Sequence, residues 1–379
     1  MHDHPILNHL RSRRLAMIAE LKRLVEHESP SHDKPALDAL AELLAGRLSE
    51  LGGAAQVVAN PGGGNHVLGR FPGPEENRPA LILTHFDTVW PAGTLARMPA
   101  REEAGRLFGP GVYDMKASLV MLFAALESCG RLGFKSPRPV TVLATSDEEI
   151  GSPSSRSLIE ALARDCAYVL VLEPPLADGG LKTARKGVGR FTIEIEGKAA
   201  HSGVAPGSGA SAILELAHQI MKIHALNDVK AGTTLNVGVV HGGTVSNVVA
   251  ARAVAQVDVR ATMLDSAARI DQALRSLEPA IAGTRIKVKG RFSRPPMERT
   301  PAIAGLFDRV RLIGRGLGIE LTEGSTGGGS DGNFTAAIGI PTLDGLGVKG
   351  GGAHADDEHI QIESLPERAA LLAALLLNL

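Results

Sequence analysis

Three acidic residues, Asp147, Glu148 and Glu149, follow the short apolar run Val140–Ala144, which is typical of a buried strand. Neighbouring carboxylates at the end of such a strand repel one another unless cations neutralise them. One carboxylate can then bind a metal ion while the next carries a proton. The alternative is a solvated loop or a helix N-terminus, where acidic residues are also favoured. The choice depends on whether the rest of the chain supplies further ligands.

Further candidate ligands end two other strand-like runs. His85 and Asp87 follow Ala80–Thr84, and a histidine two residues before an aspartate is the pattern expected when the aspartate orients a metal-binding imidazole. The alternative is a capping aspartate beside an incidental histidine. Glu173 ends the apolar run Ala167–Leu172 and precedes a proline. A glutamate there is better explained as a ligand than as a packing residue.

Two glycine-rich segments precede the remaining candidates. The glycines of Gly109–Gly111 allow close backbone approach just before Asp114, which opens a predicted helix, and Gly350–Gly352 leads to His354. For Asp114 the alternative is a plain N-cap. Because ligands of parallel α/β sheets bind at the carboxyl ends of the strands, one edge of the sheet is expected to carry His85, Asp114, Glu149 and Glu173.

Strands that alternate with helices predict an α/β fold, with a mostly parallel sheet flanked by helices. From Gly187 onward the strands instead alternate apolar and polar residues, which indicates an inserted α+β domain in βαββαβ order. The predicted domains are a catalytic one, 1–187 with 299–379, and an inserted lid or dimerisation domain, 188–298. Outside the insert, helices are expected at 12–27, 34–51, 115–130, 302–316, 333–337 and 365–377, and a late strand at 341–346.

Composition excludes several classes of function. The chain has 379 residues, a formal net charge of -1 and 3% aromatic residues, so neither nucleic acid nor an acidic membrane surface is an expected partner. No apolar run is long enough to span a membrane. The two cysteines form no disulfide framework, and Met1–Pro5 do not begin a secretory signal. The expected location is the cytoplasm.

Taken together and in order, these motifs resemble the di-zinc hydrolase family of glutamate carboxypeptidases and aminoacylases, which includes succinyl-diaminopimelate desuccinylase. The segments that carry the resemblance in the predicted catalytic domain are His85-Phe86-Asp87, Gly109-Pro110-Gly111 with Asp114-Met115-Lys116, Asp147-Glu148-Glu149-Ile150-Gly151-Ser152, Glu173-Pro174 and His354. In the predicted insert, Gly197–Gly203 and Gly242-Gly243 followed by Asn247 match the lid segments of that family. The carboxypeptidase branch is the most similar one.

The resemblance implies a set of metal ligands. His85, Asp114 and Glu173 would bind one zinc ion, and Asp114, Glu149 and His354 would bind a second. Nitrogen and oxygen ligands suit zinc, and cobalt or manganese could substitute. The Asp114–Met115 peptide would be cis.

The resemblance also implies catalytic roles. Asp87 would hydrogen-bond His85. Glu148 would be the general base, taking a proton from a water that bridges the metals and returning it to the leaving amine. His201, from the lid, would donate a hydrogen bond to the developing oxyanion.

The resemblance also implies substrate binding at Arg294, which lies where the carboxypeptidase branch has an arginine for the terminal carboxylate of the substrate. A planar guanidinium suits a carboxylate, and Asn247 and Gly328 are expected to line the same pocket. The alternative for Arg294 is a surface arginine beside a turn. The predicted reaction is hydrolysis of an amide or peptide bond that releases a C-terminal amino acid, glutamate in the carboxypeptidase branch. The alternative is an N-acyl-amino-acid amidohydrolase of the same family. By the same resemblance the chain would be a homodimer.

Two unrelated functions have partial motifs. Gly328-Gly329-Ser330-Asp331-Gly332 matches the GxSxG turn of serine hydrolases, with His354 or His359 as partner, although no strand is expected directly before it. Gly345–Gly350 matches GxGxxG, as in dinucleotide-binding modules, but Gly351–His354 follows where a helix should begin. Neither alternative explains the acidic residues at the strand ends.

Overall fold

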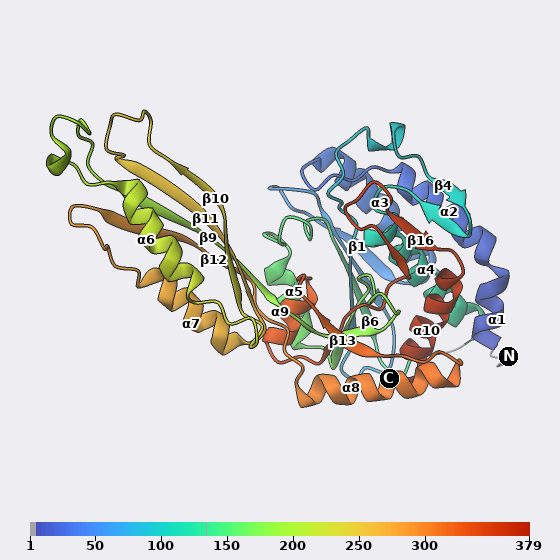
Figure 1. Ribbon diagram of the computed structural model, residues 1–379. Coiled ribbons are helices and arrows are strands. Elements are labelled where there is room, and N and C mark those ends of the chain that lie inside the picture. The colour runs from blue at the N-terminus through green and yellow to red at the C-terminus, as the bar shows by residue number, and fades with distance from the viewer. Residues whose placement is uncertain (1–4, 134) are drawn as a thin grey trace. The chain divides into compact units, whose positions relative to one another are not determined.

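The computed structural model describes residues 5–133 and 135–379 (Figure 1). The chain divides into two compact units. The large unit comprises Met1–Thr183, Arg299–Thr326 and Ser330–Leu379, and the inserted unit comprises Ala184–Glu298 with Gly327–Gly329. Met1–His4, which belong to the segment where no secretory signal was expected, lie outside the described residues.

A six-stranded sheet forms the centre of the large unit, in the order β1-β2-β6-β3-β7-β14. The strands are β1 (Ala54–Val58), β2 (His66–Phe71), β3 (Ala80–His85), β6 (Val140–Thr145), β7 (Tyr168–Val171) and β14 (Thr342–Leu343). The pairs β3/β6, β3/β7 and β7/β14 are parallel, whereas β1/β2 and β2/β6 are antiparallel. Every residue of β3 and β6 is buried, as in a sheet covered on both faces. The predicted mostly parallel sheet is confirmed.

Helices flank this sheet (Figure 1). They are α1 (Pro5–Ser12), α2 (Arg14–Glu26), α3 (Lys34–Glu50), α4 (Ala117–Arg131), α5 (Arg156–Arg164), α8 (Pro301–Gly316), α9 (Gly332–Ala337) and α10 (Ser364–Asn378), with short turns η1 (Thr94–Ala96) and η2 (Val112–Lys116). Helices α4 and α10 are buried along most of their length and pack against each other. Their largely apolar sequences match that burial, because a helix without a polar face belongs in the core.

Two smaller sheets complete the large unit. One has the order β15-β16-β5-β4, formed by β15 (Gly350–Gly351), β16 (His359–Gln361), β5 (Arg106–Phe108) and β4 (Arg101–Glu103). In the other, β13 (Glu323–Thr326) pairs with β8 (Leu181–Arg185). Among the described residues, no helix is both long and apolar enough to cross a membrane.

The inserted unit has the βαββαβ order expected from its sequence. Its elements are β9 (Gly187–Glu196), η3 (Pro206–Ser208), α6 (Ala212–His224), β10 (Thr234–Gly242), β11 (Arg252–Ala261), α7 (Leu264–Arg275) and β12 (Arg285–Arg294). The strands form an antiparallel sheet in the order β10-β11-β9-β12. Phe191, Ile193 and Ile195 of β9 pack in one core with Leu216 and Ile223 of α6. The alternating apolar residues of this unit therefore cover one face of the sheet with its helices.

Two predicted elements differ in detail. The helix predicted at 115–130 begins at Ala117, because Asp114 and Met115 have non-helical backbone angles and the peptide between them is cis. The strand predicted at 341–346 is limited to Thr342–Leu343. It ends there because Asp344 exchanges backbone hydrogen bonds with Lys182 and Gly345 turns the chain at a φ of 79°.

Candidate metal centre

His85 ends β3 at the carboxyl edge of the parallel strands, with only 2% of its side chain exposed. Its Nε2 atom lies 3.1 Å from Oδ1 of Asp114 and 3.5 Å from Oε1 of Glu173. Its Nδ1 atom lies 3.1 Å from the main-chain oxygen of Asp87, which fixes the orientation of the ring. One imidazole therefore faces two carboxylates that come from different segments of the chain.

Asp114 lies between two histidines. Its Oδ1 atom faces His85, and its Oδ2 atom lies 3.5 Å from Nε2 of His354. The same His354 nitrogen lies 3.2 Å from Oε1 of Glu149. The side chains thus form two groups, each with one imidazole and two carboxylates. One group contains His85 and Glu173, the other contains His354 and Glu149, and both include the carboxylate of Asp114.

Glu148 also faces this centre. One of its carboxylate oxygens and the nearest ligand atoms of His85 and Glu173 all lie within 4.8 Å of one another. The nearest ligand atoms of His85, Asp114 and Glu149 also lie within 4.8 Å of one another. Glu148 is half-buried, whereas Glu173 is buried. The structure thus places His85, Asp114, Glu148, Glu149, Glu173 and His354 close together.

The electrostatics of the cluster fit bound cations. Burial raises the pKa of Glu149 to about 7, and the nearby charge of Asp114 adds to the shift. Hydrogen bonds to Asp114 and Glu149 raise the pKa of His354 to about 10. Burial would lower the pKa of His85, but hydrogen bonds to Asp114, Asp87 and Glu173 raise it well above its usual value. The carboxylates around the two imidazoles therefore favour positive charge at this place, which bound metal ions would supply. This donor set of imidazole nitrogens and carboxylate oxygens suits zinc.

Asp87 stabilises the turn that carries Glu148 and Glu149. It is fully buried, and its two carboxylate oxygens accept the backbone N–H groups of Glu148 (3.1 Å) and Glu149 (3.2 Å). The hydroxyl of Ser31 donates to the same carboxylate at 2.7 Å. Oδ1 of Asp87 also lies 3.4 Å from Nδ1 of His85. Asp87 thus connects a candidate ligand with the turn that carries two others.

The first acid of the triplet plays a different part. The carboxylate of Asp147 accepts the hydroxyls of Ser154 and Ser155, each at 2.6 Å, and their backbone N–H groups. These hydrogen bonds stabilise the turn before α5. Asp147 therefore has the structural role at a helix N-terminus that was the alternative to metal binding. No pattern in the sequence separates Asp147 from its two neighbours.

Glu358, which the sequence does not indicate as a site residue, is fully buried beside the centre. Its carboxylate accepts the backbone N–H groups of Gly111, Tyr113 and Asp114 and the indole N–H of Trp90. Burial raises the pKa of this carboxyl group, and the N–H donors oppose that shift. The sequence offers no signal for it, because Glu358 follows two exposed acidic residues in an ordinary polar turn.

The remaining predicted site residues lie in the inserted unit. His201 and Asn247 are exposed, and the main-chain oxygen of Asn247 accepts the N–H of Ser202 at 3.0 Å. Arg294 is only 5% exposed, so the surface-arginine alternative is wrong. The main-chain oxygen of Gly328 lies 3.3 Å from Nη1 of Arg185, which donates to it.

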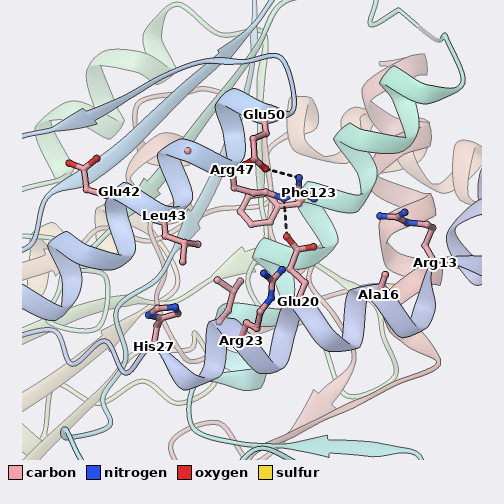
Figure 2. Close-up of a pocket in the computed structure, with 12 residues that line it drawn as sticks. Arg13, Ala16, Glu20, Arg23, His27, Glu42, Leu43, Arg47, Glu50 and Phe123 are labelled. Atoms are coloured by element: carbon pink, nitrogen blue, oxygen red, sulfur yellow. Dashed lines mark hydrogen bonds and ion pairs between the residues drawn. The ribbon is translucent and has the colours of Figure 1, made fainter.

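The structure does not support the two unrelated functions. Strand β13 ends at Thr326, so the expectation that no strand precedes the GxSxG segment is wrong. Ser330, however, is fully buried and donates its hydroxyl to Asp344 at 2.5 Å, not to a histidine. The GxGxxG segment, residues 345–350, is followed by β15 and not by a helix. A separate cleft of about 470 Å³ between α2 and α3 (Figure 2) contains Arg47, which already bonds Glu20 and Glu50. Two arginines of this cleft, Arg13 and Arg47, are thus paired with carboxylates of the protein itself.

Comparisons with known proteins agree with this geometry. The model of a family described as Peptidase family M20/M25/M40 matches residues 81–378. Carboxypeptidase G2 of Pseudomonas sp. (strain RS-16) is 30% identical over 374 residues, covering 96% of this chain and 89% of the relative. Succinyl-diaminopimelate desuccinylase of Dechloromonas aromatica (strain RCB) is 26% identical over 358 residues, covering 88% and 92%. The crystal structure of aminopeptidase PepT from Bacillus cereus ATCC 10987 shares the fold, with a TM-score of 0.79 at 22% identity, covering 96% of this chain and 98% of that one.

Proposed function

The chain belongs to peptidase family M20/M25/M40 and is a hydrolytic enzyme, and from this premise we propose that it is a zinc-dependent carboxypeptidase that releases a C-terminal amino acid from a peptide or acyl amide. The observation that carries the proposal is the carboxylate of Asp114, which faces His85 on one oxygen and His354 on the other. A carboxylate shared in this way suits a centre of two metal ions.

Two zinc ions are the proposed cofactors, with cobalt or manganese able to substitute. His85, Asp114 and Glu173 would hold one, and Asp114, Glu149 and His354 the other. When bound, the ions would polarise the scissile carbonyl and acidify the attacking water. The proposed ligand set uses every imidazole and carboxylate of the cluster except the carboxylate of Glu148.

Glu148 is the proposed general base. Its carboxylate takes a proton from the attacking water and delivers it to the nitrogen of the leaving amine. Asp87 supports this role, because it holds the Glu148 N–H at 3.1 Å and so fixes the backbone from which the base extends. The proximity of a Glu148 oxygen to the ligand atoms of His85 and Glu173, within 4.8 Å, also supports this role.

His201 is proposed to stabilise the oxyanion that forms on the substrate. Its Nδ1 atom accepts the backbone N–H groups of Gly203 at 3.1 Å and Val204 at 3.2 Å. An imidazole that accepts at Nδ1 carries its hydrogen on Nε2, which is therefore the donor. The exposed ring can offer this donor to a substrate held at a metal centre.

Arg294 is proposed to bind the terminal carboxylate of the substrate, with Asn247 and Gly328 lining the same pocket. A guanidinium that is 5% exposed is desolvated in advance, which strengthens a charge-assisted pair with a carboxylate. The resemblance of the sequence motifs to the glutamate carboxypeptidase branch favours a substrate that ends in glutamate.

A homodimer through the inserted unit is also proposed. Edge strand β10 carries no acidic or basic residue apart from His241, and its Val239 and Val240 are 40% and 49% exposed. The opposite edge strand, β12, exposes basic side chains that discourage pairing, namely Arg285, Lys287, Lys289 and Arg291. On α6, Leu214 and Met221 are 54% and 72% exposed. A second copy that pairs along β10 would cover these apolar side chains.

The proposed location is the cytoplasm, since Cys129 and Cys166 are free thiols. The alternative activity is that of an N-acyl-amino-acid amidohydrolase, which the relationship to succinyl-diaminopimelate desuccinylase supports.

A panel of substrates tests the two activities. Dipeptides and N-acyl amino acids with C-terminal glutamate, alanine or lysine would be compared with their C-terminal amides. The carboxypeptidase proposal predicts the highest kcat/KM for peptidyl or acyl glutamate and loss of turnover on the amides. Preference for one acyl group regardless of the terminal residue would instead establish the amidohydrolase.

A further inference from the structure

The loop 109–114 carries Asp114 but has almost no hydrogen bonds to regular secondary structure. Apart from Pro110, it contains five backbone N–H groups, and four of them donate to Glu358. Gly109 donates to the main-chain oxygen of Glu358 at 3.3 Å, and the other three donate to its carboxylate. The fifth, of Val112, donates to the main-chain oxygen of Gly109.

The carboxylate of Glu358 is completely enclosed by donors. Its Oε1 atom accepts the N–H groups of Tyr113 at 2.9 Å and Asp114 at 3.0 Å. Its Oε2 atom accepts the N–H of Gly111 at 2.8 Å and the indole N–H of Trp90 at 2.7 Å. Successive N–H groups that converge in this way form an anion-binding concavity, and here the anion is a side chain of the protein.

The geometry of the loop depends on this arrangement. Gly111 has a φ of 68°, a conformation that suits glycine, and a Cβ at that position would lie 2.5 Å from Cγ2 of Thr88. The Asp114 N–H and its carboxylate belong to the same residue. A bond from Glu358 to that N–H therefore restricts the position from which the carboxylate reaches both histidines.

Glu358 also lies on the segment that carries a second ligand. The Glu358 N–H donates to the main-chain oxygen of Ala355 at 2.9 Å, closing a turn directly after His354. His354 has a φ of 62°, which is strained for a residue with a side chain and needs support from its surroundings. Beyond Glu358 the chain enters β16, which pairs with β5 just before the Asp114 loop. One residue thus connects the two loops that hold Asp114 and His354.

We propose that Glu358 is a positioning residue that fixes the spacing of Asp114 and His354 and thereby sets the affinity of the centre for both metal ions. This inference rests on the metal centre of the proposed function. Groups that orient metal ligands without touching the metal typically contribute 10–100-fold to affinity. A purely structural role for Glu358 would instead change the stability of the metal-free and metal-loaded proteins equally.

Glu358→Gln is the discriminating substitution. Glutamine keeps the shape of the side chain but has only one acceptor oxygen. Its NH₂ group would face two of the four N–H donors, which would then have no acceptor. Asp357→Asn is the matched control, because it removes an exposed carboxylate from the adjacent position. Trp90→Phe is a milder variant that removes the indole donor, together with part of the ring, and leaves Glu358 intact.

The experiment measures zinc binding to the full chain by competition with a chromophoric chelator. It also measures the rise in melting temperature when zinc is added to the chelator-stripped protein. The expected results are a zinc dissociation constant at least about tenfold higher for Glu358→Gln, a smaller rise in melting temperature, and native values for Asp357→Asn. Trp90→Phe should weaken zinc binding less than Glu358→Gln does.

Native zinc affinity in Glu358→Gln would overturn the inference. If Glu358→Gln does not fold, Trp90→Phe decides, and native zinc affinity in that variant would equally reject a positioning role. These outcomes are distinct from failure of the proposed function, in which the native protein itself would bind no zinc.

Discussion

Asp87→Asn tests how the turn with the proposed base is held. The Asp87 carboxylate is fully buried and accepts the Glu148 N–H on Oδ1, and the Glu149 N–H and the Ser31 hydroxyl on Oδ2. Asparagine has the same shape but only one acceptor oxygen. In the better of its two orientations, this oxygen keeps Glu149 and Ser31, and the NH₂ group faces the Glu148 N–H.

The expected magnitude follows from that count. One buried N–H without an acceptor costs about 1–3 kcal/mol of folding free energy. The lost bond is the one that supports the backbone of Glu148, and Asp87 also loses the charge that lies 3.4 Å from Nδ1 of His85. We therefore expect kcat/KM to fall about 10–100-fold, as for other groups that orient metal ligands, together with a lower melting temperature.

Steady-state kinetics on the best substrate and scanning calorimetry measure both effects. Asp165→Asn is the control, since Asp165 is an exposed aspartate of the same unit. Ser31→Ala removes one hydrogen bond to Asp87 and leaves both backbone bonds in place, so it should lower stability by about 1 kcal/mol and leave kcat near the native value. Native kcat/KM in Asp87→Asn would refute the reasoning, as would an equal loss of kcat in Ser31→Ala.

Three further predictions concern single side chains. Glu148→Gln should keep the bound metals and lower kcat by at least about 10²-fold, whereas Glu149→Gln should lower metal content; exchanged phenotypes would reverse these assignments. Arg294→Ala should raise KM, and so lower kcat/KM by about tenfold or more, for substrates with a free terminal carboxylate. It should leave kcat/KM for the amidated analogues unchanged, and equal losses on both kinds of substrate would indicate a structural role. His201→Ala should lower kcat by about 10²–10³-fold with unchanged zinc content, and mixing it with Glu148→Gln should restore activity if the histidine acts in a dimer partner. A strictly monomeric chain with an inactive His201→Ala variant would contradict the dimer.

Much of the centre could be predicted because its residues follow recognisable strands. His85 is the last residue of β3 and Glu149 lies in the turn that follows β6, and the apolar residues of these two buried strands are plain in the sequence. Parallel pairing of these strands then brings their ends together, as the register of His85 with Thr145 shows. Local sequence is sufficient where a strand end alone determines the position of a side chain.

Prediction failed where burial depends on contacts between distant segments. Glu358 is 0% exposed only because β16 pairs with β5 and brings the loop of Asp114 against it. Its neighbours Asp356 and Asp357 are exposed, and residue type does not separate the three. Arg294 was equally ambiguous, because a guanidinium beside a turn is usually exposed and here is 5% exposed.

The proposed metal centre uses His85, Asp114, Glu149, Glu173 and His354 to hold two catalytic metal ions. It is tested most directly by stripping the protein with a chelator, returning zinc stepwise, and measuring bound metal and hydrolysis in the same samples. We expect about two zinc ions per chain at saturation, and activity that is absent from the stripped protein and restored by the metal. A protein that binds no transition metal, or that hydrolyses its substrate equally well after chelation, would contradict it.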